Sequence, residues 1–283
     1  MWTRSESSPL GLGPGDVLGP YKIDEFIGEG GTSVAFRAVR EDGTTVALKI
    51  LKRHIAGDDV AIRRFMHEAR AAQEVRHPHL VPIVEAGESG EMHFIATAYV
   101  AGPTLHQLIK RDGPLPLPDL VRLIAQVASA LDRLHKQGFV HRDVKSSNIL
   151  LDERGDAYLT DLGLAKGPEY TTLTLAGRVM GTIDYLAPEL IRGQPAGPGS
   201  DIYGLGCVVY EALAGHCPFS HRGHLQIGVA HLEEEPPDHA AGRRDVPESF
   251  TRVALLALAK DPSQRPPTAV AYARLLQTAA RGT

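Results

Sequence analysis

The sequence predicts an α+β fold with two lobes, a small β-rich lobe that contains one helix and a larger lobe that is mostly α-helical. The chain has 283 residues, which is more than a single hydrophobic core usually organises. Residues 21–98 carry short runs rich in β-branched side chains, separated by turn residues. From residue 99 onward, apolar side chains recur at helical spacing instead.

We divide the chain into a leader and one domain of two lobes. Residues 1–20 are rich in Ser, Gly and Pro and have almost no apolar periodicity, so we expect a disordered leader. The domain spans residues 21–277, with the first lobe at 21–98 and the second at 99–277. No internal repeat divides it further.

The first lobe is expected to hold several strands and one helix. Strand-like runs lie at residues 34–39, 44–51 and 93–98. A helix is predicted near residues 58–75, because one apolar stripe there contains Ile62, Phe65, Met66, Ala69 and Ala72. Glu68 falls at the edge of this stripe.

The second lobe is expected to be built mainly from helices. Residues 120–135 are apolar along one face, and Gly138 is the expected C-terminal cap of this helix. Residues 201–214 are apolar on nearly all sides, which predicts a helix buried through the centre of the lobe. A shorter amphipathic helix is expected at residues 268–278.

Composition excludes several classes of protein. The net charge is only −4 and both signs are mixed along the chain, so we expect no nucleic-acid partner. An apolar run of about 18 residues is missing, and residues 1–20 lack the apolar core of a signal peptide, so we expect a cytoplasmic chain. Cys207 and Cys217 have no CxxC companion, which predicts buried or half-buried free thiols in a reducing compartment.

The first chemical motif is a glycine-rich turn between two predicted strands. Gly28, Gly30 and Gly31 would let backbone N–H groups approach a polyphosphate without a clash from Cβ atoms. A turn of this kind is more often a plain hairpin, and no helix follows Ser33 closely enough for a dinucleotide-binding fold.

The second motif is a lysine on a strand with a carboxylate partner on the next helix. Alternation places Lys49 on the same face as Ala47. Strand lysines are usually solvated edge charges. Glu68 is positioned to pair with Lys49, and a lysine held in this way is a point charge suited to phosphates.

The third motif follows the predicted helix at residues 120–135. The polar run His141-Arg142-Asp143-Val144-Lys145-Ser146-Ser147-Asn148 precedes an apolar strand, where burying so many polar groups is costly unless they are used. A turn at residues 155–156 indicates a hairpin, after which Asp161 follows. Asn148 and Asp161 are therefore expected to converge as oxygen ligands of the kind that Mg²⁺ prefers.

The order of these motifs resembles the eukaryotic-like protein kinase family over about residues 21–277. The segments HRDVKSSN, GTIDYLAPE and SDIYGLGCVVYEALAGHCPF are most similar to bacterial serine/threonine kinases. The resemblance implies the bilobal protein-kinase-like fold, with a nucleotide cleft between the lobes. It also implies transfer of the γ-phosphate of ATP to Ser or Thr hydroxyls of protein substrates, with Mg²⁺, or Mn²⁺ as the alternative, as the metal ion.

The same resemblance implies roles for individual residues. Asp143 is the expected catalytic base, Lys145 is expected at the γ-phosphate, and Thr182 is expected near the acceptor hydroxyl. Asn148 and Asp161 would hold the metal ions, while Lys49 would contact the α- and β-phosphates and be oriented by Glu68. The nucleotide would be bound by Ile27, Gly28, Gly30, Gly31, Val34, Ala47, Lys49, Thr97, Tyr99, Val100 and Leu150.

The residues around the expected catalytic base also indicate regulation and support. A phosphate on Thr172 or Thr174, in the hydroxyl-rich loop after Asp161, would pair with Arg142 and would come from autophosphorylation between associated molecules. The alternative is a plain surface loop that contains threonines. Asp201 resembles the family aspartate that braces the catalytic loop, although Ser200 or Asp201 also fits a plain helix N-cap. Arg265 resembles the arginine that pairs with Glu189.

Three residues depart from the commonest family pattern. Ser33 stands where a third loop glycine is usual, and its Cβ should stiffen the loop without removing backbone donors. Leu162 replaces a phenylalanine and fills a similar apolar space. Ala98 stands where many relatives carry a hinge carboxylate.

Alternative classes remain to be weighed against an active kinase. A pseudokinase or docking module would bind ATP or partners without phosphoryl transfer, but every charged group that transfer requires is present. A P-loop NTPase or a dinucleotide enzyme would need motifs that the sequence lacks. Whether the chain is a cytoplasmic protein or the cytosolic domain of a longer membrane-anchored kinase stays open.

Overall fold

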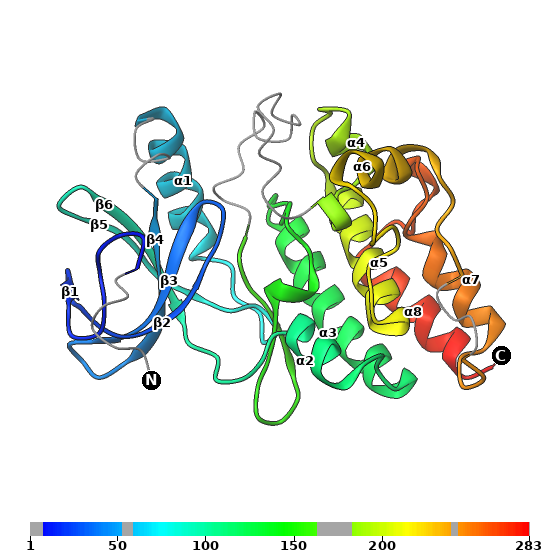
Figure 1. Cartoon of the computed structure of the whole chain (residues 1–283), viewed down its shortest axis with the longest axis horizontal. Coiled ribbons are helices and arrows are strands. Elements are labelled where there is room, and N and C mark those ends of the chain that lie inside the picture. The colour runs from blue at the N-terminus through cyan, green and yellow to red at the C-terminus, as the bar shows by residue number, and fades with distance from the viewer. Residues whose placement is uncertain (1–7, 53–58, 163–182, 239–242, 283) are drawn as a thin grey trace. The chain divides into compact units, whose positions relative to one another are not determined.

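The computed structural model describes residues 8–52, 59–162, 183–238 and 243–282. The chain forms two compact units (Figure 1). One contains the residues up to Arg76 and Val81–Val100, and the other contains His77–Leu80 and the residues from Ala101 onward. The fold class is confirmed, because the first unit is β-rich and the second is mostly helical. The sequence did not indicate that His77–Leu80 groups with the second unit.

The first unit is built on an antiparallel sheet of six strands in the order β1-β2-β3-β4-β6-β5. Alternation along the strands buries one face, where Val34, Phe36, Leu48, Ile50 and Phe94 form the apolar core. The helix α1 packs against β5. The bounds are β1 Val17–Leu18, β2 Tyr21–Glu29, β3 Ser33–Arg40, β4 Thr45–Leu51, β5 Ile83–Ser89, β6 Met92–Ala98 and α1 Asp59–Ala72.

The predicted disordered leader is wrong for residues 8–20. Strand β1 pairs with β2, with Leu18 opposite Tyr21, and Leu18 is buried. Leu10 and Leu12 also pack against the apolar core of the sheet. These leucines are separated by Gly and Pro turns, so no period of 2 or 3.6 marks them in the sequence. They are ordered because the sheet offers them an apolar surface.

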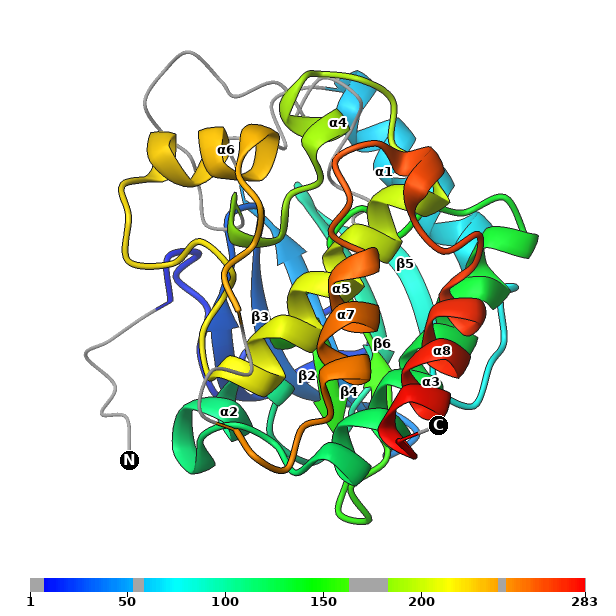
Figure 2. The ribbon, with the colours of Figure 1, turned by 90° about the vertical axis from the view of Figure 1, so that its right-hand side faces the viewer.

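The second unit is built around α5, which passes through its centre (Figure 2). Residues 200–213 of this helix are all buried, as its uniformly apolar sequence predicts. Contacts join α5 to α3 and α7, and α8 packs along α3. The bounds are α2 Leu105–Asp112, α3 Leu117–Lys136, β7 Ile149–Leu151, β8 Ala157–Leu159, α4 Pro188–Ile191, α5 Pro198–Ala214, α6 His224–Glu233, α7 Glu248–Leu256 and α8 Ala269–Ala280.

The ends of two helices matter for the candidate site. Gly138 follows α3 with φ 80°, a conformation that favours glycine, and so ends the helix as predicted. Helix α5 begins earlier than predicted, at Pro198, with Gly197 at its N-cap position. Asp201 therefore lies inside the helix, and its interpretation as a helix cap is wrong.

Two glycines let α5 approach its neighbours closely. A Cβ atom on Gly204 would lie 2.8 Å from the carbonyl oxygen of Val144, and one on Gly206 would lie 2.7 Å from the Cβ of Ala257. Such distances are shorter than van der Waals contact, so only a residue without Cβ fits unless the backbone shifts. The close approach to Val144 brings α5 against the segment that contains Asp143.

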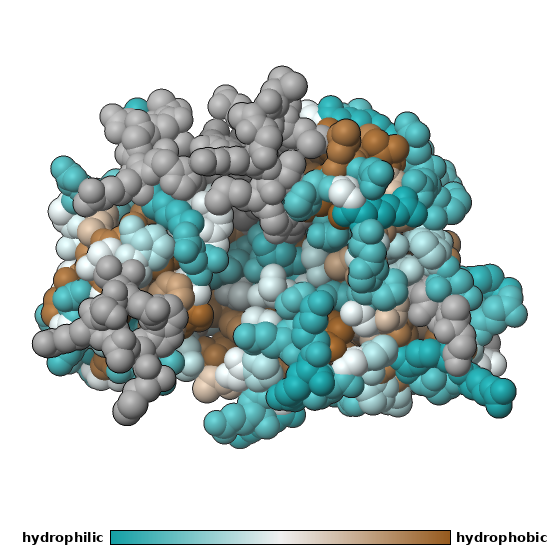
Figure 3. Space-filling model, viewed as in Figure 1, coloured by the Kyte–Doolittle hydropathy of each residue, from teal (hydrophilic) through white to brown (hydrophobic). Residues whose placement is uncertain are grey.

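Three further features concern the hydrophobic surface, membrane-spanning helices and the cysteines. Hydrophobic surface lies in the region of α4 and α6, where Leu225 and Val229 are exposed (Figure 3). None of the helices in the described ranges is both long and apolar enough to cross a membrane. Both cysteines are free thiols, with Cys207 buried and Cys217 half-buried, as predicted.

Substituting Gly204→Ala should destabilise the protein by about 2 kcal/mol, because the backbone of Val144 must move to admit a methyl group. Gly199→Ala in the same helix is the matched control, since its Cβ would meet Pro262 at an ordinary 3.4 Å. We expect that control to leave stability within about 1 kcal/mol of the unsubstituted protein. Urea unfolding of the three proteins measures the difference, and equal losses in both variants would contradict the close-packing argument.

Candidate active site

The polar segment after α3 is held in place by one buried carboxylate on α5. Asp201 accepts hydrogen bonds from the backbone N–H of His141 and of Arg142, both at 2.8 Å. The imidazole Nε2 of His135 lies 2.7 Å from the same carboxylate. Arg142 has φ 64°, a strained conformation for a residue with a side chain, and its bond to Asp201 helps to maintain that strain. The predicted brace by Asp201 is therefore observed.

His141 links this segment to the residue that directly follows the β7–β8 hairpin. Its imidazole is fully buried, and Nε2 lies 2.9 Å from the carbonyl oxygen of Thr160. A carbonyl only accepts, so Nε2 carries the proton and Nδ1 is the acceptor for the backbone N–H of Asp143, at 3.3 Å. This tautomer joins Thr160, His141 and Asp143 into one chain of hydrogen bonds. The sequence did not predict this role for His141.

The carboxylate of Asp143 is held by two neighbours. Asn148 donates from Nδ2 to the Asp143 backbone oxygen at 2.8 Å and to its Oδ2 at 3.0 Å. The ammonium of Lys145 lies 2.9 Å from the same Oδ2. The side chain of Asp143 is 11% exposed, so solvent reaches it while its orientation is fixed. The structure thus brings three of the predicted site residues together.

The β7–β8 hairpin brings Asn148 next to Asp161. Ile149 pairs with Leu159, and the N–H of Thr160 donates to the carbonyl of Asn148 at 3.0 Å. Because Nδ2 of Asn148 is used as a donor toward Asp143, its amide oxygen is the atom suited to a cation. Together with the Asp161 carboxylate, this makes a donor set of hard oxygens that fits a divalent cation such as Mg²⁺.

A second polar network fixes the other side of the catalytic segment. The hydroxyl of Ser146 lies 3.0 Å from the hydroxyl of Tyr185, which donates to Glu211 at 2.6 Å. His106 contacts the Glu211 carboxylate at 3.0 Å. Burial, with the nearby Cys217 and Glu211, raises the pKa of Tyr185 well above its usual range, so it stays a donor. No periodic pattern in the sequence predicts this network, since its members come from four separate segments.

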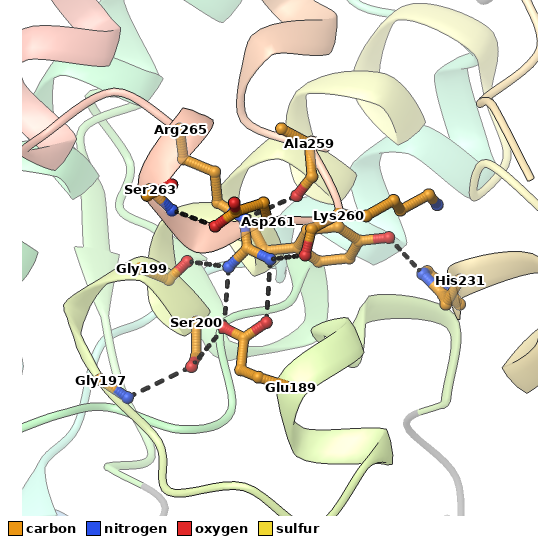
Figure 4. A network of polar contacts seen from close by, with 11 residues as sticks. Glu189, Gly197, Gly199, Ser200, His231, Ala259, Lys260, Asp261, Ser263 and Arg265 are labelled. Carbon is orange, nitrogen blue, oxygen red and sulfur yellow. Dashed lines mark hydrogen bonds and ion pairs between the residues drawn. The ribbon is translucent and has the colours of Figure 1, made fainter. Parts of the chain in front are cut away.

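A buried ion pair supports the segment that precedes α5 (Figure 4). Arg265 contacts Glu189 with two nitrogens at 2.7 and 2.8 Å, as the predicted pairing requires. Ser200 donates to Glu189 at 2.8 Å, and the guanidinium also reaches the carbonyl of Gly199 and lies over the ring of Tyr203. Burial alone would raise the pKa of Glu189, but the hydrogen bond and charge of Arg265 outweigh it and lower this pKa.

In the first unit, sheet register sets which residues share a face with Lys49. Residues directly opposite in an antiparallel sheet point to the same side, and Lys49 pairs with Ala35 and with Ile95. Ala47, predicted on this face, pairs with Thr97, whose hydroxyl lies 3.5 Å from the Ala47 carbonyl. Glu68 is half-buried on α1, and its pairing with Lys49 stays a prediction.

One predicted nucleotide contact is displaced by one position. Val34 is fully buried in the core on the opposite face of β3 from Lys49. Ala35 is the β3 residue that shares the face of Lys49. With the pairing of β3 and β4 known, the register opposite Lys49 identifies Ala35 as this residue.

The glycine-rich segment forms the turn between β2 and β3. The N–H of Gly30 donates to the carbonyl of Ser33 at 2.8 Å, which closes the turn. Ile27, at the end of β2, is 49% exposed, as a residue facing a ligand would be. Tyr99 and Val100 follow β6 and are half-buried, and Leu150 is half-buried on β7. Gly31 lies within the turn.

Several predicted residues lie outside the described ranges. They are Thr172 and Thr174, proposed as regulatory positions, and Thr182, proposed near the acceptor. Arg142, their expected partner, is described on the braced segment. The pairing therefore stays a prediction.

A braced aspartate beside a lysine and an asparagine, with a second aspartate after a hairpin, is the arrangement of a phosphotransferase of the protein kinase class. The protein kinase domain family matches residues 21–275. The chain therefore belongs to the protein kinase family, whose members use ATP and a divalent metal ion. The predicted family is confirmed.

The relatives of this chain are bacterial kinases. It is 39% identical to the serine/threonine-protein kinase PrkC of Bacillus subtilis over 89% of this chain and 39% of PrkC. It is 37% identical to the serine/threonine-protein kinase pkn3 of Myxococcus xanthus over 91% of this chain and 49% of pkn3. The chain thus spans between two fifths and one half of the length of these two relatives.

Solved structures agree with the fold. The kinase domain of PknI from Mycobacterium tuberculosis superimposes with a TM-score of 0.77 at 27% identity, covering 96% of this chain and 100% of that one. Rad53 in complex with AMP-PNP gives a TM-score of 0.71 at 27% identity, covering 91% of this chain and 65% of that one.

Substituting Glu189→Gln should cost about 3 kcal/mol of stability at pH 7, because it leaves the buried Arg265 charge uncompensated. A carboxylate with a lowered folded-state pKa stabilises the protein above its unfolded pKa of about 4.3 and loses this contribution as the pH falls through the folded value. The difference between the two proteins should therefore shrink below about pH 4. Urea unfolding across pH measures it.

The control for this change is Glu248→Gln, which removes the exposed pair with Arg252. We expect it to alter stability by less than about 0.5 kcal/mol. A Glu189→Gln effect that is equally small, or independent of pH, would contradict the assigned ion pair.

Proposed function

We propose that this domain transfers the γ-phosphoryl group of ATP to Ser and Thr hydroxyls of protein substrates. The observation that carries the proposal is the Asp143 carboxylate, oriented by Asn148 and Lys145 on a segment braced by Asp201. The names of the bacterial relatives, all serine/threonine-protein kinases, support the acceptor class. The proposed domain spans residues 21–277.

In this proposal Asp143 positions the acceptor hydroxyl and takes its proton. The hydroxyl oxygen forms a bond to the γ-phosphorus as the bond to the bridging β–γ oxygen breaks, which leaves ADP and a phosphorylated side chain. Lys145, beside Asp143, stabilises the negative charge of the transferring group. Catalysis comes mainly from positioning and from charge stabilisation, since these residues form no covalent bond to the substrate.

Asn148 and Asp161 are the proposed ligands of Mg²⁺, with Mn²⁺ as the alternative ion. A metal ion held by these two residues would supply positive charge that neutralises the phosphates of ATP. The orientation of the Asn148 amide supports this role, because its nitrogen is turned toward Asp143. The hydrogen bond from Thr160 to the Asn148 carbonyl keeps the two ligand-bearing segments adjacent.

We assign nucleotide contacts to the first unit on the basis of the sheet register. Gly28 near the end of β2, with Gly30 and Gly31 in the turn that follows, would bind the phosphates through backbone donors, and Lys49 would bind the α- and β-phosphates. Ala35 replaces Val34 in the proposed adenine-binding set, because it shares the face of Lys49. The other proposed members are Ile27, Ala47, Thr97, Tyr99, Val100 and Leu150. Rad53, a fold neighbour, was solved with AMP-PNP.

Regulation by phosphorylation is a further part of the proposal. A phosphate on Thr172 or Thr174 carries charge that Arg142 is suited to pair with, and Arg142 stands next to Asp143. Phosphorylation of one molecule by another would require transient self-association. Thr182 is the proposed residue near the acceptor hydroxyl.

A catalytically inactive docking module is the competing function. It is disfavoured because each of the proposed catalytic and metal-binding side chains is present. With a net charge of −4, a nucleic-acid partner is also disfavoured. We keep both a cytoplasmic protein and the cytosolic part of a longer membrane-anchored kinase as proposals.

Asp143→Asn and Lys49→Met should each lower phosphate transfer from labelled ATP to a generic basic protein by at least about 100-fold, because they remove the proton acceptor and the phosphate-binding charge. Exposed Asp119→Asn and exposed Lys22→Met are matched controls and should leave the rate unchanged. Chelation of metal should abolish transfer, and Mg²⁺ should restore it. Equal incorporation by all five proteins would exclude the proposed activity.

Thr172→Ala combined with Thr174→Ala should lower the specific activity of the protein after incubation with ATP, because the partner for Arg142 is then lost. Mass spectrometry of residues 170–174 and phosphatase treatment provide the readouts. If these residues carry no phosphate, and phosphatase leaves the activity unchanged, the switch does not exist.

A further inference from the structure

A cavity of about 470 Å³ lies on the second unit, away from the catalytic segment. It is formed where the C-terminal half of α3 meets the start of α8, two helices that pack along each other. His77, from the short segment that groups with this unit, also lines it. The lining residues are His77, Ser129, Asp132, Arg133, Lys136, Thr268, Val270, Ala271 and Arg274. The residues assigned to catalysis are absent from this set.

The charges around the cavity are mostly positive. Arg133, Lys136 and Arg274 contribute cations, and Asp132 contributes the single carboxylate of the lining. That carboxylate is already used, because its two oxygens accept the backbone N–H groups of Ala269 at 2.9 Å and Val270 at 3.2 Å. Asp132 thus caps the first turn of α8 and compensates little of the positive charge.

Two lining side chains bear on anion binding. The Nε atom of Arg133 is buried away from solvent and has no hydrogen-bond partner among the described residues, so the charge of this guanidinium is not fully compensated within the protein. The Nδ1 of His77 accepts the backbone N–H of His79 at 3.2 Å, so the proton resides on Nε2, which is a donor. Burial, followed by the nearby His79 and Arg133, lowers the pKa of His77 and keeps it neutral at pH 7.

We propose that this cavity binds a small organic phosphate monoester. Guanidinium and ammonium groups are the side chains that proteins use for phosphate oxygens, and three cations against one engaged carboxylate match a dianion. The volume falls in the range of sites for small organic ligands, and Val270 and Ala271 provide apolar surface for the body of the ligand. None of its lining residues belongs to the proposed nucleotide or acceptor sites.

The test is a titration of the isotope-labelled full chain with phenyl phosphate. The backbone NMR signals are recorded at each step of the titration. It is run on the Asp143→Asn protein, with a non-hydrolysable ATP analogue and Mg²⁺ present to occupy the proposed nucleotide site. We expect saturable shifts at Ser129, Thr268 and Ala271, with a Kd of about 1 mM or below, and weaker binding at high salt. Since the readout is local and needs no turnover, it is independent of the proposed phosphoryl transfer.

Variants identify the residues responsible. Lys136→Gln with Arg274→Gln, both exposed and therefore tolerant of change, should weaken binding about 10-fold by removing two charge-assisted contacts. Lys110→Gln with Arg281→Gln removes two exposed cations of the same unit outside the cavity and should leave the Kd unchanged. Inorganic phosphate should bind more weakly than phenyl phosphate. Shifts that do not saturate, equal binding by both double variants, or an equal response to phenol would overturn the proposal.

Discussion

The candidate active site depends on one buried carboxylate, that of Asp201. Its two oxygens accept the N–H groups of two successive residues, His141 and Arg142, and one of them also contacts His135. A buried carboxylate is stable only when such donors surround it, so the catalytic segment stabilises Asp201 as much as Asp201 orders the segment. The interaction is possible because α5 is buried throughout and because Gly204 lets it approach Val144. The position of Asp143 is thus set by a helix to which it does not belong.

Polar groups in the second unit are buried in connected networks. Glu189 with Arg265, and Tyr185 with Glu211 and Ser146, each combine charge with several hydrogen bonds. Burying one of these groups alone would cost several kcal/mol, whereas a complete network satisfies each member. Both networks surround the segment that precedes α5. The first holds the residues just before α5, and the second also reaches the catalytic segment through Ser146.

The sequence predicted the chemistry of the site better than its supports. Lys49, Asp143, Asn148 and Asp161 can be proposed from the sequence because their residue types and order are constrained by phosphate and metal chemistry. The tautomer of His141 and the contact of Ser146 with Tyr185 depend on three-dimensional contacts that no local period encodes. The family resemblance implies Val34 as a nucleotide contact, whereas the register with Lys49, which only the structure gives, places Ala35 on that face and Val34 in the core.

The ordered part of the leader has a consequence for how the domain is delimited. The family match begins at residue 21, but Leu10, Leu12 and Leu18 cover the apolar core of the sheet, and β1 hydrogen-bonds to β2. A protein shortened to the family boundary would expose this apolar surface to water. It would also uncover the edge of β2 at Tyr21 and Lys22, where β1 pairs with it, and an open strand edge is a template for association between chains. Residues 8–20 therefore belong to the folded first unit, although they precede the family match.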